Sequence, residues 1–310
     1  MRFMLSVLAL ALAATPALAL PRVIASVVPV HGIVSAVMGD TGQPELLLDG
    51  SLSEHRAKFT PQQIAALGQA DVVFMIGQGL EAKLSQLSGS EAVNGKRFVE
   101  LALAPGVATL PIREGGAWEA HDHDHGHDHD HGHDHEGVLR FDPHVWLDPV
   151  NAKAMAATVA AALAKADPPN AAAYRANAEA FAASLAEEET RIAAELAPVR
   201  DQPYVVFHDA YQYFENRFGL SAAGSISDVS AQAPSAERLA EVRKKITDVK
   251  AKCVFREPQY DGKLVAAVVE GTGARQGVLD PLGASLTPGP DAYRQLLGNL
   301  AASLKDCLAP

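Results

Sequence analysis

The stretch from residue 170 to about residue 197 contains neither glycine nor proline, which constrains this part of the chain to one long helix. Apolar residues recur within it at spacings of three, four or seven: Tyr174, Ala178, Phe181, Leu185, Ile192 and Leu196. This spacing places one apolar stripe along the helix. At 1.5 Å per residue the helix would span about 40 Å, enough to cross a whole molecule and to join two lobes rigidly.

Both flanks of this stretch alternate short runs of β-branched residues with helical segments. The strands that we expect lie at residues 23–28, 46–48, 72–76, 98–101, 204–207, 254–256 and 277–279. Such alternation is typical of parallel sheets whose faces are covered by helices. We therefore expect an α/β protein of two lobes, each a mainly parallel sheet flanked by helices, joined by one long rigid helix.

The first 19 residues have the pattern of a secretory signal peptide. Arg2 supplies a positive charge, residues 5–14 form an apolar run, and residues 15–19 end in an Ala-x-Ala cleavage pattern. The run is shorter than the roughly 20 residues that span a bilayer. We predict export with cleavage after Ala19. The rest of the chain is then expected to divide into an N-terminal lobe over 20–168, a linking helix over 169–198 and a C-terminal lobe over 199–310.

The chain has 2 cysteines, Cys253 and Cys307. In an oxidising compartment such as the periplasm an isolated pair most simply forms a disulfide bond. The alternative is two free thiols that serve a metal ion.

The segment 118–137 is a tract rich in histidine and acidic residues. It holds eight of the 12 histidines: His121, His123, His125, His127, His129, His131, His133 and His135. Because residues 121–135 offer nothing apolar to bury, we expect a mobile loop. Imidazoles and carboxylates together suit zinc, copper or nickel, so the tract should provide weak accessory metal sites. The net charge of −11 argues against nucleic acid as a partner.

The other four histidines suggest a more defined site. His208 follows the strand at 204–207, His55 lies after the strand at 46–48, and His144 precedes a helix. Ligands of open α/β sheets bind outside the carboxyl ends of the strands, where Asp280 is also expected. We predict a tetrahedral zinc site between the lobes, formed by the three imidazoles and one carboxylate. Asp280 and Glu54 are both candidates for the fourth ligand, whereas His31 is expected to be structural.

At these positions the sequence resembles the zinc-specific, ZnuA-type substrate-binding proteins of ABC importers, and the likeness covers essentially the whole mature chain. It rests on residues 53–55, 79–81, 142–149 (DPHVWLDP), 207–211, 257–259 and 279–283 (LDPLG), together with the histidine-rich tract and the cysteine pair. The resemblance implies two α/β lobes bridged by one long helix, and zinc ligands at His55, His144 and His208. Within the family the fourth position varies between the glutamate before the first histidine, the aspartate of DPLG and water. Residues 56–59 (RAKF) depart from the Asp-Tyr that relatives commonly show after the first histidine, and this departure can alter the mouth of the cleft.

The function that we expect is capture of Zn²⁺ in the periplasm and delivery to an ABC permease in the inner membrane. The protein should act as a monomer, with zinc as its cargo, and should not be an enzyme. One alternative is a periplasmic zinc buffer or chaperone. Another is a zinc hydrolase, which needs an open coordination position and a general base, and the sequence offers no His-Glu-x-x-His motif.

Overall fold

A computed structural model describes residues 20–93, 97–113 and 141–309. The N-terminal sheet consists of β1 (Val23–Val27), β2 (Glu45–Leu48), β3 (Val72–Met75) and β4 (Arg97–Glu100). Its strand order is β2-β1-β3-β4, and all neighbouring strands are parallel. The predicted signal peptide and histidine-rich tract lie outside the described residues.

The C-terminal sheet repeats this arrangement. It consists of β5 (Tyr204–His208), β6 (Ser225–Ser227), β7 (Cys253–Arg256) and β8 (Arg275–Val278). Its order is β6-β5-β7-β8, again with parallel neighbours. The predicted fold class is therefore confirmed, with two differences in detail. Strand β6 was not predicted from the sequence, and β8 begins two residues earlier than predicted.

Nine α-helices are present among the described residues. They are α1 (Val28–Met38), α2 (Pro61–Gln69), α3 (Ala82–Ser88), α4 (Pro149–Ala166), α5 (Ala171–Leu196), α6 (Gln212–Phe218), α7 (Ala236–Asp248), α8 (Lys263–Val269) and α9 (Ala292–Leu308). No helix in these residues is long and apolar enough to cross a membrane. The start of α2 has a local cause, because Thr60 and Gln63 form a capping box across the first turn and Pro61 occupies the first helical position.

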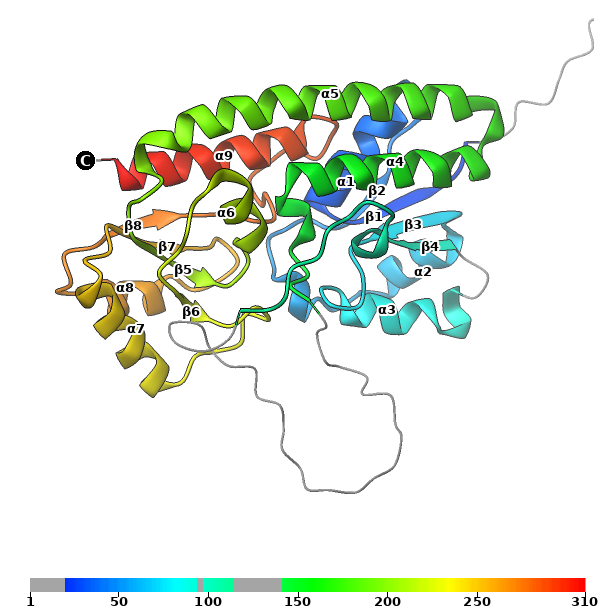
Figure 1. Cartoon of the computed structure of the whole chain (residues 1–310). Helices are drawn as coiled ribbons and strands as arrows, with labels where there is room; N and C mark the ends of the chain where they lie inside the picture. Colours follow the sequence, from blue (N-terminus) through cyan, green and yellow to red (C-terminus); the bar gives the residue numbers. More distant parts are fainter. Residues whose placement is uncertain (1–19, 94–96, 114–140, 310) are drawn as a thin grey trace, which may run out of the picture.

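Helix α5 runs along both lobes, beside α4 and α9 (Figure 1). It has 26 residues, and its buried side chains are the six that the apolar spacing predicts. Helices α1 and α5 contact each other, and each of them contacts α4 and α9, so the four helices form a central layer. One hydrophobic cluster joins this layer to one face of each sheet, from Val23 in β1 to Phe255 in β7 and Leu308 in α9. The lobes are thus packed on a common core as well as connected by the helix.

The opposite face of each sheet has its own smaller core. Ile24, Val73 and Met75 pack against α2 and α3 in the N-terminal lobe. Val205, Ile226 and their neighbours pack against α7 and α8 in the C-terminal lobe. Since alternate residues of a strand point to opposite faces, both faces of each sheet are covered.

The two cysteines form a disulfide bond between the start of β7 and the last helix, with 6.2 Å between their Cα atoms. The bridge spans a sequence separation of 54 residues, which the chain-entropy model equates to about 4 kcal/mol of stabilisation. It fastens α9 to the C-terminal sheet.

Candidate metal centre

Four side chains meet between the lobes, at the carboxyl ends of the strands. Each of Glu54, His55, His144 and His208 offers one ligand atom, and these atoms lie within 4.8 Å of one another. Glu54 and His55 lie in a short 3-10 turn after β2, His144 directly precedes another 3-10 turn, and His208 ends β5. The structure thus brings together the three predicted histidines. It places three of the four side chains in the N-terminal lobe and His208 in the C-terminal lobe.

The spacing of the ligand atoms suits a tetrahedral zinc ion. The Nε2 atoms of His144 and His208 are 3.2 Å apart. Oε1 of Glu54 lies 3.7 Å from Nε2 of His55 and 3.9 Å from Nε2 of His144. Ligands at zinc-to-nitrogen distances of 2.0–2.1 Å occupy tetrahedral corners about 3.3 Å apart. A small contraction of this cluster would therefore complete the coordination of one Zn²⁺.

Two buried carboxylates orient two of the imidazoles. Nδ1 of His144 lies 2.8 Å from Oδ1 of Asp142, and Nδ1 of His208 lies 2.7 Å from Oε1 of Glu257. Both carboxylates are 1% exposed. When Nδ1 donates its proton to a carboxylate, the Nε2 lone pair is left for a metal ion. These roles were not predicted from the sequence, although Glu257 follows β7 at the carboxyl end of that strand, where site residues are expected.

The other two side chains have no such support. Oε1 of Glu54 and Nε2 of His55 are buried, and neither has a hydrogen-bond partner among the described residues. Burying a polar atom without a partner costs free energy. A cation bound between them would satisfy both atoms, so the donor set fits zinc.

Burial and neighbouring charges lower the pKa values of two histidines in this cluster and raise those of the third histidine and of the glutamate. Desolvation and the neighbouring imidazoles lower the pKa of His55 and His144 well below the usual 6.5. Desolvation also acts against charge on His208, but the carboxylates of Glu257 and Glu54 outweigh it and raise its pKa to about 9. Burial raises the pKa of Glu54 to about 7. The cluster thus holds neutral imidazoles ready for a metal, together with one proton that a metal must displace.

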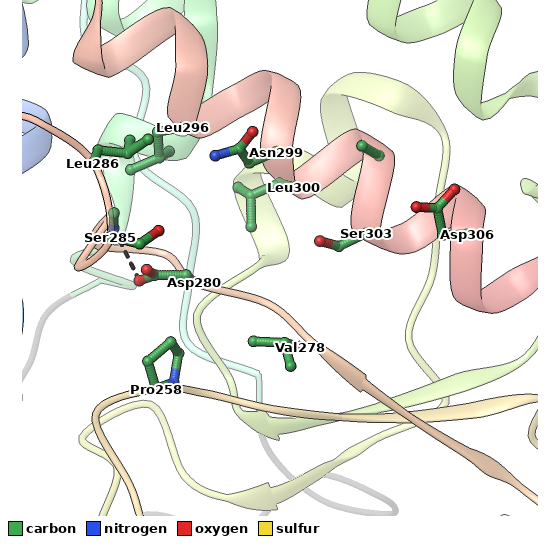
Figure 2. Close-up of a pocket in the computed structure, with 12 residues that line it drawn as sticks. Pro258, Val278, Asp280, Ser285, Leu286, Leu296, Asn299, Leu300, Ser303 and Asp306 are labelled. Carbon is green, nitrogen blue, oxygen red and sulfur yellow. Dashed lines mark hydrogen bonds between the residues drawn. The ribbon is translucent and has the colours of Figure 1, made fainter.

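Asp280 has a different role in this structure. Its carboxylate accepts hydrogen bonds from the backbone N–H groups of Leu282, Gly283 and Ala284, and from the side-chain amide of Gln259. It caps the turn after β8, the structural role common for aspartate before proline. Figure 2 shows this residue in the lining of a cavity of about 250 Å³ that also borders α9. Of the two candidates for the fourth ligand, the geometry therefore favours Glu54.

His31 lies outside the cluster. It is buried in α1, where Nε2 is 3.0 Å from the carbonyl oxygen of Pro44 and Nδ1 is 3.3 Å from Oγ of Ser35. These contacts agree with the structural role expected for it. The eight histidines of the tract at 118–137 lie outside the described residues, so the accessory sites stay a prediction.

A family model described as "Zinc-uptake complex component A periplasmic" (ZnuA) matches residues 23–307. The chain is 47% identical to the high-affinity zinc uptake system protein ZnuA of Brucella suis biovar 1 over 306 residues, covering 93% of this chain and 91% of that protein. It is 38% identical to the protein of the same name from Paracoccus denitrificans, covering 97% and 96% of the two chains.

Solved structures show the same architecture. A crystal structure of ZnuA superposes with a TM-score of 0.77 at 27% identity, covering 94% of this chain and all of that one. A ZnuA deletion mutant with zinc bound has a TM-score of 0.75 at 26% identity, covering 94% of this chain and 99% of that one.

Proposed function

The chain belongs to the ZnuA family of periplasmic zinc-uptake components, and from this membership we propose that it captures Zn²⁺ and delivers it to an ABC permease for uptake. The observation that carries the proposal is the meeting of Glu54, His55, His144 and His208 within 4.8 Å of one another. Three nitrogen ligands and one carboxylate oxygen suit zinc better than they suit magnesium or calcium, which prefer oxygen ligands.

The proposed role is binding without chemistry on the cargo. A catalytic zinc keeps one coordination position open for water, whereas this cluster supplies four protein ligands. The two buried carboxylates nearest the imidazoles, Asp142 and Glu257, are engaged with imidazole nitrogens. Neither is placed as a free general base.

The binding part of the proposal is tested by titrating the purified mature protein with Zn²⁺ in a calorimeter. A variant that lacks residues 118–137 separates the cluster from the histidine-rich tract, for which we propose several weak sites. The deletion variant should keep one tight site per chain and lose only the weaker ones. A stoichiometry of zero in that variant would contradict the proposed site.

The transport part requires a cellular measurement. Deleting the gene should reduce uptake of radioactive ⁶⁵Zn when external zinc is scarce, and supplying the wild-type protein should restore it. A protein that only buffers or hands over zinc in the periplasm would leave uptake unchanged.

We further propose that the protein is an exported monomer cleaved after Ala19. N-terminal sequencing of the exported protein should therefore begin at Leu20. Light scattering of the purified protein should give the mass of one chain, and a dimer mass would contradict this assignment.

A further inference from the structure

The segment from Gly50 to Arg56, which carries Glu54 and His55, is attached to the opposite lobe at three points. It follows β2 of the N-terminal sheet, but its side chains and backbone reach residues 231, 259 and 260 of the C-terminal lobe. We call these three hydrogen bonds the cross-lobe latch. They surround Glu54 and His55, whose ligand atoms have no hydrogen-bond partner among the described residues.

The first two contacts come from consecutive residues after β7. Nε2 of Gln259 donates to the carbonyl oxygen of Gly50 at 3.0 Å, and the hydroxyl of Tyr260 donates to Oγ of Ser53 at 2.8 Å. Gly50 has a φ of +77°, and a Cβ atom placed there would lie 3.3 Å from Cα of Ala284. Glycine at this position thus lets the segment approach the turn that Asp280 caps.

The third contact lies at the other end of the segment. Nη2 of Arg56 donates to the carbonyl oxygen of Ala231 at 3.0 Å. Ala231 has a φ of +53°, which is unusual for a residue with a Cβ atom. Oδ1 of Asp228 accepts hydrogen bonds from the backbone N–H groups of Ser230 and Gln232 and stabilises this turn. The carbonyl group that Arg56 binds is therefore held in position by a turn that Asp228 stabilises.

The latch matters because zinc would be held from both lobes. Glu54 and His55 could move away from His208 only if the segment parted from the C-terminal lobe. Parting would break the bonds of Gly50, Ser53 and Arg56, which water can replace only in part. The latch thus raises the free-energy barrier to separating this segment from the C-terminal lobe, although none of its hydrogen bonds involves a metal ligand.

On the basis of the proposed function, we propose that the cross-lobe latch sets the rate at which bound zinc leaves, with Arg56 and Tyr260 as positioning residues. Arg56 also brings a positive charge beside His55, and this charge by itself would repel a bound cation. The two effects predict opposite outcomes when Arg56 is replaced. Loss of the latch accelerates zinc release, whereas loss of the charge alone slows it.

The test measures the slow phase of zinc release into excess chelator by stopped flow, using the mature full-length protein loaded with less than one equivalent of Zn²⁺. Arg56→Ala and Tyr260→Phe should each accelerate zinc release by about threefold to tenfold. This is the change in rate expected when the barrier to release loses the net free energy of one hydrogen bond. Arg56→Lys keeps a charged N–H donor, so its release rate should return part of the way to the wild-type rate.

The matched control is Arg243→Ala. The guanidinium of Arg243 also donates to an alanine carbonyl, that of Ala267 at 2.9 Å, but within the C-terminal lobe. This variant should release zinc at the wild-type rate. Circular dichroism and the melting temperature of the metal-free proteins should show that Arg56→Ala is as well folded as the control.

Three results would each contradict either the latch or the proposed function. Wild-type rates in both Arg56→Ala and Tyr260→Phe, with one tight zinc site retained, would reject the latch and leave the proposed function intact. Slower release from Arg56→Ala would show that its charge dominates and would also reject the latch. Absence of a tight site in the wild-type protein would reject the proposed function itself.

Discussion

The two halves of the metal cluster are built differently. His144 and His208 are each held by a buried carboxylate through Nδ1, so their rings are oriented whether or not a cation is present. Glu54 and His55 lie in a 3-10 turn, and their facing atoms have no hydrogen-bond partner in the described part of the chain. One half is preorganised by side chains, while the other depends on how its backbone segment is held. We therefore expect His144 and His208 to contribute most to zinc affinity, and the segment that carries Glu54 and His55 to set the rate of zinc release.

The largest effect should come from removing an oriented imidazole. His144→Ala and His208→Ala should each weaken zinc binding by more than about 100-fold, which exceeds the usual cost of losing a group behind a ligand. His31→Ala is the control and should retain the wild-type dissociation constant, measured with a competing chelator of known affinity. An unchanged affinity in either cluster variant would mean that the preorganised half does not bind the metal.

A smaller loss should follow when the supporting carboxylates are removed and the imidazoles stay. Glu257→Ala and Asp142→Ala should weaken binding about 10- to 100-fold, because the Nδ1 proton and the ring orientation lose their partner. Glu257→Gln should cost less, because its amide oxygen still accepts a hydrogen bond. Asp167→Asn is a suitable control, since Asp167 is also buried but pairs with Tyr174 and Asn170 instead. Equal losses in the control would point to general destabilisation.

Zinc affinity should fall about tenfold for each unit by which the pH drops from about 9 to about 7. Between these values His208 carries a proton in the metal-free protein, because its pKa is raised to about 9, and zinc must displace it. Below about 7 Glu54 is protonated as well, so the fall should steepen to about 100-fold per unit. His55 and His144 add little here because their pKa values are lowered.

Chelator competition across this pH range measures both slopes, and Glu54→Gln should remove the steeper one. A flat profile between pH 9 and 7 would contradict the proton on His208.

The smallest effects concern the fourth ligand. Glu54→Gln should weaken zinc binding about tenfold, because a neutral amide oxygen replaces a carboxylate beside the cation. Asp280→Asn should leave the affinity within about twofold, because the Asp280 carboxylate is occupied by the turn after β8. X-ray absorption at the zinc edge would report the coordinating atoms. The reverse ranking of the two variants would make Asp280 the ligand.

Sequence patterns predicted the large features of this molecule because these depend on repeated signals. The apolar stripe of α5 and the strands β1, β3 and β5 consist of long or strongly apolar runs, and their carboxyl ends indicated where His208 should lie. Strand β6 was missed because Ser225, Ile226 and Ser227 form only three residues with one apolar side chain. The start of β8 was missed because Arg275 and Gln276 are exposed on an edge strand.

The fourth ligand and the latch could not be predicted for a different reason. Glu54 and Asp280 both lie in segments that follow strands, and spacing along the chain does not show which carboxylate is already used by backbone N–H groups. The bond from Arg56 to Ala231 joins residues 175 positions apart and depends on a turn with positive φ at an alanine. No local pattern marks such a contact.

The packing of α9 limits how early the N-terminal lobe can fold during synthesis. This last helix contacts α1 and α5 and completes the hydrophobic cluster that begins at Val23. The N-terminal lobe therefore lacks part of its core until residues 292–308 have been made, and it cannot finish folding ahead of the rest of the chain. For a chain exported through a membrane, as we propose, we expect this delay to keep the nascent protein unfolded during translocation. The completed fold then forms on the side where its disulfide can be oxidised.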